Sequence, residues 1–329
     1  MRVYVSLSML IIVLCLASIL VAIPSVDDFS LHNPLWNGLS RLREEYGFEY
    51  VSLSSIDLLP ENAVLFIFPS KPIDGLQAEA LMRFINGGGV AVFLDEYGYS
   101  NPILNPLGLN ITSSLLRDPL YKWRSSGLPY VWVEFNGKTF KICLNYASTI
   151  QLGGFRALGF SSYFSFLDED LDGMHDASEP SGRMCIAASK TFGRGVVIVF
   201  SDSSIFLNSM LSIADNRALL EELCRSRKPY VLKDLVYFGI YTMLRESFIS
   251  ALYTLYSLMF NSSISYPIIF LTVLAVFSAS GRLYSRFGRR LKPMDLRVRL
   301  YSTARLHPGW SREVLEEILP EVFEGEGGR

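Results

Sequence analysis

Two apolar segments near the two ends of the chain constrain its fold more than any other feature. Val3–Ile23 and Ser263–Ser280 contain no charged residue. A helix of the second segment's length measures about 27 Å, which is near the lower limit for crossing a membrane. We therefore expect two transmembrane helices with a globular region between them. The alternative for the second segment is a helix buried in a protein core.

Positive charge beside these segments predicts their orientation. Eight Lys/Arg and a single acid lie between Gly281 and Gly309, whereas the region between the segments is acidic. Lys/Arg next to a membrane span favour the cytoplasmic side. We expect a two-pass protein of the cell membrane, in contact with the lipid bilayer, with both termini cytoplasmic and the central domain outside. The basic cluster could also attract nucleic acid, but membrane topology explains it, so we expect no nucleic acid.

The first segment also has some features of a secretory signal peptide. Arg2 precedes the apolar stretch, as in such signals. The exit Leu20–Pro24 is a poor small-residue cleavage site, however, and the stretch is longer than a usual signal core. We favour an uncleaved anchor and leave cleavage as the alternative.

Strand and helix signals alternate between residues 34 and 100. Continuous apolar runs bounded by Pro or Gly indicate strands buried on both faces, and apolar residues spaced by three or four indicate helices. A β-rich stretch interrupts this rhythm, and the turn Asn136-Gly137 within it predicts a hairpin. The expected strands are 50–53, 63–68, 90–94, 130–135, 138–144 and 195–200, and the expected helices are 34–46, 74–86, 215–224 and 230–260.

This pattern predicts an α/β fold, in which a three-layer domain with a parallel sheet carries a β-rich insertion and is flanked by two transmembrane helices. The expected parts are an anchor at 1–24, the external α/β domain at 25–228 with its insertion at about 110–190, an amphipathic helical region at 229–262, a transmembrane helix at 263–281, and a cytoplasmic basic tail with a short helix at 282–329.

Three stretches carry a family resemblance. They are Asp74–Asp95 with its Phe-Ile-Asn-Gly-Gly-Gly helix end, Ser100–Asn105, and Gly193–Asn208 followed by Asp215-Asn216. Together these resemble the membrane-anchored proteins called domain of unknown function 4350. The resemblance implies a class I glutamine amidotransferase-like (flavodoxin-like) fold related to the auxiliary subunits of gliding-type ABC transporters. It also implies a protein partner in a membrane complex that is linked to transport or to an ATPase.

The residues argue against catalysis. The amidotransferase fold implies a cysteine nucleophile on the turn after a buried strand, but Asp95-Glu96-Tyr97-Gly98 occupies that turn. Nucleophilic catalysis requires a base that is positioned beside the nucleophile, and the three histidines His32, His175 and His307 form no evident group with an acid. We therefore expect no enzyme. Cys143 and Cys185 could form a disulfide, which the sequence alone does not decide.

The clearest chemical motif is an acidic loop that begins at Asp168. It fits the pattern D-x-[DN]-x-[DN]-G-x5-E of calcium loops, with Gly173 at the sharp turn. Calcium prefers several oxygen ligands, which alternate carboxylates supply when the loop wraps around the ion. We favour a structural Ca²⁺ site without flanking helices, and the alternative is a solvated acidic loop. The expected ligands are Asp168, Asp170, Asp172, Met174, Asp176 and Glu179.

A second candidate site is the edge of the sheet where the parallel strands end. Ligands in open α/β sheets bind outside the carboxyl ends of the strands. The alternative is that some of these residues only cap the helices that follow. The residues expected there are Ser70, Asp95, Glu96, Asp202, Ser203 and Asn208.

These observations favour a non-catalytic, membrane-anchored binding or accessory subunit of a membrane complex. One alternative is a calcium-stabilised structural protein of the cell envelope, and another is a hydrolase that uses Asp95 or Asp202. In the tail, residues 311–323 predict a short helix that either docks on a cytoplasmic partner or lies on the membrane face.

Overall fold

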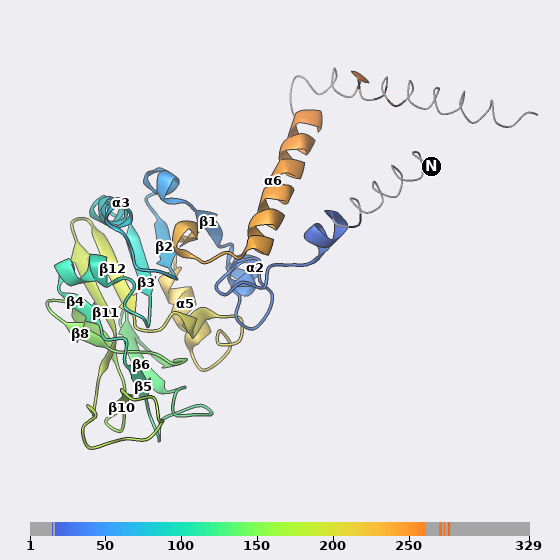
Figure 1. Ribbon diagram of the computed structural model, residues 1–329. Helices are drawn as coiled ribbons and strands as arrows, with labels where there is room; N and C mark the ends of the chain where they lie inside the picture. Colours follow the sequence, from blue (N-terminus) through green and yellow to red (C-terminus); the bar gives the residue numbers. More distant parts are fainter. Residues whose placement is uncertain (1–14, 16, 261–269, 272, 274–275, 277–329) are drawn as a thin grey trace, which may run out of the picture. The chain divides into compact units, whose positions relative to one another are not determined.

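The computed structural model describes residues 15, 17–260, 270–271, 273 and 276 of the chain (Figure 1). The chain divides into two compact units, Met1–Ile249 and Ser250–Arg329, and the first contains the sheet described below. Among the described residues, no helix combines the length and the apolar character that crossing a membrane requires. This finding corrects the prediction of a two-pass membrane protein. Most of both apolar segments, and the whole tail 282–329, lie outside the described residues.

Five parallel strands form one half of a nine-stranded sheet. The central strands β2 and β3 are continuous apolar runs, and their burial on both faces explains that composition. The strand β13 lies between β1 and β2, so the last strand among the described residues enters the interior of the sheet. In spatial order the five are β1 (Glu49–Val51), β13 (Lys228–Leu232), β2 (Ala63–Ile67), β3 (Val90–Leu94) and β12 (Gly195–Phe200).

Four antiparallel strands extend the same sheet beyond β12. A tight turn at Gly193-Arg194 reverses the chain into β12, and Gly193 has a φ of +58°, a conformation that favours glycine. The predicted hairpin at Asn136-Gly137 is confirmed, because β6 pairs with β7 across that turn. In spatial order the four are β11 (Cys185–Phe192), β9 (Arg156–Phe160), β6 (Tyr130–Phe135) and β7 (Lys138–Cys143).

The predicted fold class, a three-layer parallel sheet flanked by two transmembrane helices, is therefore wrong. The sheet is mixed, and strands of the β-rich stretch at about 110–190 join the main sheet. The apolar run Gly195–Phe200 indicates burial on both faces, but burial does not reveal the direction of each neighbouring strand. Here β12 pairs in parallel with β3 on one side and antiparallel with β11 on the other.

Helices cover both faces of the parallel half. Alternate residues of a strand point to opposite faces, so Phe66 packs in one core with Leu42 of α2, whereas Leu65 packs in a second core with Leu81 of α3. The helix α3 begins with a capping box, because Asp74 accepts the Gln77 amide at 2.9 Å and Gln77 accepts the Asp74 amide at 3.0 Å. The helices are α2 (Ser40–Tyr46) on the first face and α3 (Gly75–Asn86) on the second (Figure 1). A further helix, α5 (Asn216–Leu223), shares the first core and contacts β7 of the antiparallel half.

Short elements complete the unit. Two small antiparallel pairs, β5 with β10 and β4 with β8, lie outside the main sheet. Their bounds are Leu115–Arg117 with Phe166–Asp168 and Leu109–Ile111 with Ile150–Leu152. The remaining short helices are η1 (Leu53–Leu58), α4 (Asn101–Leu104), η2 (Asn105–Leu107), η3 (Ser204–Phe206) and η4 (Lys233–Leu235).

The region after residue 228 differs from the sequence prediction. A helix was expected over 230–260, but Tyr230 belongs to β13 and the helix α6 spans Ile240–Phe260. The β-branched and aromatic run Tyr230-Val231 favours a strand, and pairing with both β1 and β2 satisfies its backbone. The helix 34–46 likewise shortens to Ser40–Tyr46, because residues 34–39 form turns.

Candidate functional site

A pocket of about 460 Å³ lies at the edge of the sheet where the parallel strands end. We call it the rim pocket. The segments that follow β2, β3, β12 and β13 contribute to it, together with the loop 28–37 that precedes α2. Its aromatic walls are Phe29, Trp36, Phe68, Tyr97, Tyr99 and Tyr237, and its polar groups are Asp28, Asn37, Ser70, Glu96, Asn145, Ser203 and Ser204.

Asp95, the residue after β3, organises the turn beside the pocket. Its side chain is buried and accepts three backbone N–H groups, from Tyr97 at 2.9 Å, Gly98 at 3.0 Å and Ser100 at 2.6 Å. Burial raises the pKa of Asp95, and the three amide donors oppose that shift. Asp95 therefore holds the backbone of the turn and does not line the pocket.

Asp202, the residue after β12, has a similar role. It is fully buried, and its two oxygens accept the backbone N–H groups of Ser204 at 2.7 Å and Asn145 at 2.6 Å. Burial raises the pKa of Asp202 well above its ordinary value, and the charge of Glu96 raises it further. This carboxyl fastens the end of β12 to the segment after β7.

Glu96 is the carboxylate that lines the pocket itself. It is half-buried, and its Oε2 accepts the Ser203 backbone N–H at 2.8 Å. Burial raises its pKa. The Ser203 hydroxyl is buried and has no hydrogen-bond partner among the described residues. The Glu96 carboxyl and the Ser203 hydroxyl therefore stand side by side at the pocket.

The two remaining predicted rim residues differ in placement. Ser70 lines the pocket, and its hydroxyl donates to the Leu235 carbonyl at 2.7 Å. Asn208 instead holds the start of α2, because its Oδ1 accepts the Arg41 amide at 3.1 Å and its Nδ2 donates to the Leu35 carbonyl at 2.7 Å. The structure thus brings Ser70, Glu96 and Ser203 together at the pocket and uses Asp95, Asp202 and Asn208 in the scaffold.

Sequence reasoning missed the aromatic wall. Residues 34–39 were assigned to a helix, yet they form turns that leave Trp36 68% exposed at the pocket. Tyr237 is 66% exposed and was placed inside a long helix. A Trp among Asn, Pro and Gly is the sequence signal that favours a loop at this position, and loops often carry binding residues.

The cysteines and histidines do not line this pocket. Cys143 and Cys185 are both free and buried, and burial raises their pKa values to about 12 and about 11. Thiols in this state are poor nucleophiles. His32 lies 3.4 Å from Glu246 and His175 packs against the Phe166 ring, whereas His307 lies outside the described residues.

The acidic loop predicted to bind calcium follows β10. Donor atoms of Asp168, Asp170 and Asp172 all lie within 4.8 Å of one another. Glu179 closes the loop, because its oxygens accept the backbone N–H groups of Glu169 at 2.8 Å and Asp176 at 3.1 Å. The same loop contains Met174, whose amide donates to Asp172 at 2.7 Å.

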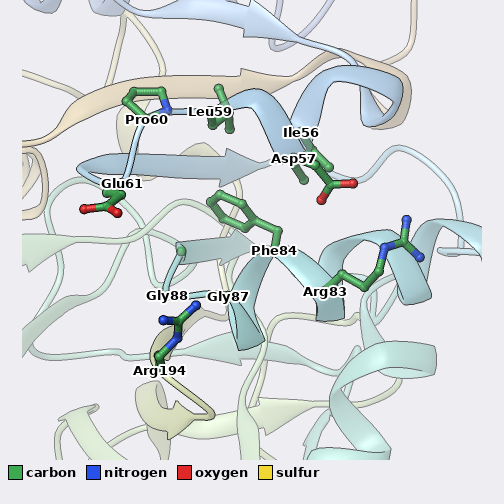
Figure 2. A pocket seen from close by; sticks show the side chains of 11 residues that line it. Ile56, Asp57, Leu59, Pro60, Glu61, Arg83, Phe84, Gly87, Gly88 and Arg194 are labelled. Atoms are coloured by element: carbon green, nitrogen blue, oxygen red, sulfur yellow. The ribbon is translucent and has the colours of Figure 1, made fainter.

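A second pocket of about 440 Å³ lies at the opposite edge of the sheet, beside the starts of β2 and β3. Figure 2 shows the guanidinium groups of Arg83 and Arg194 well apart, so they do not converge on one point. Asp57 and Glu61 add negative charge to the same lining. This mixture of separated charges indicates no particular ligand, which makes the rim pocket the better candidate.

Comparisons with known proteins give one family and several distant structures. The model of a family described as "Domain of unknown function (DUF4350)" matches residues 32–224. No curated protein matches the sequence.

Among solved structures, the mmIFT52 N-terminal domain is similar at 17% identity, covering 56% of this chain and 87% of that one, with a TM-score of 0.43. A putative ThuA-like protein from Bacteroides uniformis is similar at 12% identity over 56% of this chain and 78% of that one, with a TM-score of 0.30. A β-galactosidase from Bacillus circulans sp. alkalophilus matches at 14% identity over 49% of this chain and only 22% of that one, with a TM-score of 0.30. Likenesses this distant assign no activity to the chain.

Proposed function

The chain belongs to the DUF4350 family, and from this premise we propose that its family domain is a non-catalytic binding module that takes a small ligand in the rim pocket. One observation carries the proposal. All three carboxyls at the strand ends accept backbone amides, but Asp95 and Asp202 are buried in the scaffold, whereas Glu96 also lines the aromatic pocket. A concave, largely apolar site with a few polar groups is the usual form of a ligand pocket.

The charge of the pocket narrows the class of ligand. Its lining by described residues includes the acids Asp28 and Glu96 and contains no Lys or Arg. An anionic ligand would therefore meet only negative or neutral groups. The aromatic faces of Trp36, Tyr97 and Tyr237 favour a ligand with an apolar or cationic face. We propose a neutral or positively charged small molecule that donates N–H or O–H groups to Glu96.

We also propose that the parallel half is an amidotransferase-like scaffold that does not use the chemistry of that fold. The β–α–β order of residues 63–94 and the sharp turn at Asp95 support this view. At the position where the fold would carry a nucleophile, Asp95 accepts three backbone N–H groups and is buried.

A ligand screen with matched variants tests the binding proposal. We expect neutral and cationic compounds to raise the melting temperature of the purified chain, and Trp36→Ala and Glu96→Gln to abolish that rise. Trp132→Ala and Glu134→Gln are the controls, since both residues are exposed on β6 and neither lines the pocket. Selective binding of anionic compounds, or hits that both pocket variants retain, would contradict the proposal.

The accessory role is a separate part of the proposal and rests on the family resemblance. We expect the chain to act with a protein partner and to turn over no substrate of its own. Affinity recovery after mild crosslinking, followed by mass spectrometry, should give a stoichiometric partner. Recovery of the chain alone, or conversion of an ester or amide substrate that Glu96→Gln abolishes, would argue for a different role.

A further inference from the structure

A buried carboxylate oxygen without a partner marks the start of the acidic loop 168–179. Asp168 is the last residue of β10 and is fully buried. Its Oδ2 accepts a hydrogen bond from Arg117 Nε, whereas its Oδ1 has no hydrogen-bond partner among the described residues. Leaving a buried polar atom unpaired is costly, and a native structure rarely does so without a reason such as an ion.

The neighbouring acids converge on the same place. Donor atoms of Asp168, Asp170 and Asp172 lie within 4.8 Å of one another, although Asp170 and Asp172 are exposed and could point into solvent. Like charges this close repel each other unless a cation lies between them. The backbone holds the arrangement in place, because the Asp172 amide donates to Asp170 at 3.1 Å.

The far end of the loop folds back toward its beginning. Glu179 is only 9% exposed, and its carboxylate receives amide hydrogen bonds from both Glu169 and Asp176. Between these ends the chain turns sharply at Leu171, with a φ of +65°, and at Gly173, with a φ of +82°. The loop therefore wraps around the point where the three aspartates meet.

Charge and ligand type identify the ion. Arg117 supplies one positive charge to the loop, whereas the loop itself contains five acids in the ligand positions predicted from the sequence. All donors are oxygens, and the loop is irregular, which suits Ca²⁺ better than Mg²⁺ with its strict octahedral geometry. Zinc prefers nitrogen and sulfur ligands, and the one histidine of the loop, His175, packs against Phe166.

We propose that residues 168–179 bind one Ca²⁺ ion, with Asp168 Oδ1 as the buried ligand. Arg117 continues to donate its hydrogen bond to Asp168 Oδ2. Asp170, Asp172, the Met174 carbonyl and Glu179 complete the set, and Asp176 acts through a water. The site shares no residue with the rim pocket and does not depend on the function proposed for it. Its role is structural, because it fastens β10 to the segment that leads into β11.

Direct titration of the full chain with Ca²⁺ tests this site. After removal of bound metal with a chelator, calorimetry should show one Ca²⁺ per chain at concentrations up to about 1 mM, and the melting temperature should rise with Ca²⁺. Asp170→Ala should weaken binding roughly tenfold or more. Glu169→Gln is the matched control, because it removes one charge from the same loop but no expected ligand, and it should keep wild-type affinity.

Three outcomes would overturn the proposal: no Ca²⁺ binding by the wild-type chain, wild-type affinity in Asp170→Ala, or saturation by Mg²⁺ alone. If Asp170→Ala fails to fold, the conservative variant Asp172→Asn takes its place. The wild-type titration decides the question without any variant.

Discussion

The carboxyl groups of the strand ends and those of the loop 168–179 are arranged differently. At the strand ends, Asp95 and Asp202 are buried and direct their oxygens at backbone amides. In the loop 168–179, Asp170 and Asp172 also accept backbone amides, but donor atoms of three aspartates lie within 4.8 Å of one another. One buried oxygen, Asp168 Oδ1, has no hydrogen-bond partner among the described residues. The comparison teaches that acids lying close together in space do not by themselves indicate a metal site. A buried carboxylate oxygen that no donor reaches is the better indication of a cation.

The variant with the largest expected effect on stability, and so the strongest test of this comparison, is Asp95→Ala. Asp95→Ala should destabilise the domain by about 3 kcal/mol, because three backbone amides, the buried amide of Ser100 among them, lose their acceptor. Urea denaturation measures the change, and Glu134→Ala on the exposed surface of β6 is the control. A loss below about 1 kcal/mol would mean that the turn does not depend on Asp95.

A smaller effect should come from Arg117, the partner of Asp168. Arg117→Met leaves a buried carboxylate without its cation, and we expect a loss of about 2–3 kcal/mol when calcium is absent. Added Ca²⁺ should recover much of that loss, because the ion neutralises the same carboxylate.

Urea denaturation with Ca²⁺ and with chelator measures the recovery. Equal stability of Arg117→Met in the two conditions would show that no calcium reaches Asp168.

The smallest expected effect is on the pH dependence of the free energy of unfolding. The contributions of the two clusters to it should have opposite signs. Burial raises the pKa values of Asp95, Glu96 and Asp202, so in the folded state they keep protons that the unfolded chain has released. Their contribution to stability should therefore fall as pH rises above about 4. Burial alone would raise the pKa of Asp168 as well, but the hydrogen bonds to this carboxyl and the charge of Arg117 together lower it, so its contribution should be lost as pH falls below about 4.

The measurement is the urea midpoint as a function of pH. Asp202→Asn should flatten the decline above about pH 4, because the most deeply buried rim carboxyl no longer titrates. An unchanged slope in that variant would contradict the assignment of the decline to the strand ends.

Several single elements of the parallel half were predicted from the sequence, although the fold class was not. Ala63–Ile67 and Val90–Leu94 form strands within a residue of their expected bounds, and the helix expected over 74–86 spans Gly75–Asn86 with Asp74 as its N-cap. These elements depend on local signals: apolar runs, a capping residue and glycines that end helices. Strand order and direction depend on contacts between distant residues, which explains why β13 and the antiparallel pairing of β11 with β12 escaped prediction.

The candidate sites also contain parts that local sequence signals predict and parts that depend on contacts between distant residues. The acidic loop follows a local spacing rule, so its residues could be named from the sequence, whereas its unpaired buried oxygen could not. Half of the expected rim residues line the pocket. Asp202 and Asn208 could not be excluded beforehand, because their partners Asn145 and Arg41 are far away in the sequence. The aromatic wall comes from four segments that are far apart in the sequence: the loop 28–37 and the segments after β2, β3 and β13.

The position of β13 has a consequence for how the protein is made. This strand is the last of the sheet to leave the ribosome, yet it lies between β1 and β2 and supplies the parallel partner of each. Until residues 228–232 emerge, β1 lacks its neighbour and one edge of the apolar strand β2 is open to other chains. A nascent chain that stalls before this point should therefore depend on chaperones, and one extended past it should not.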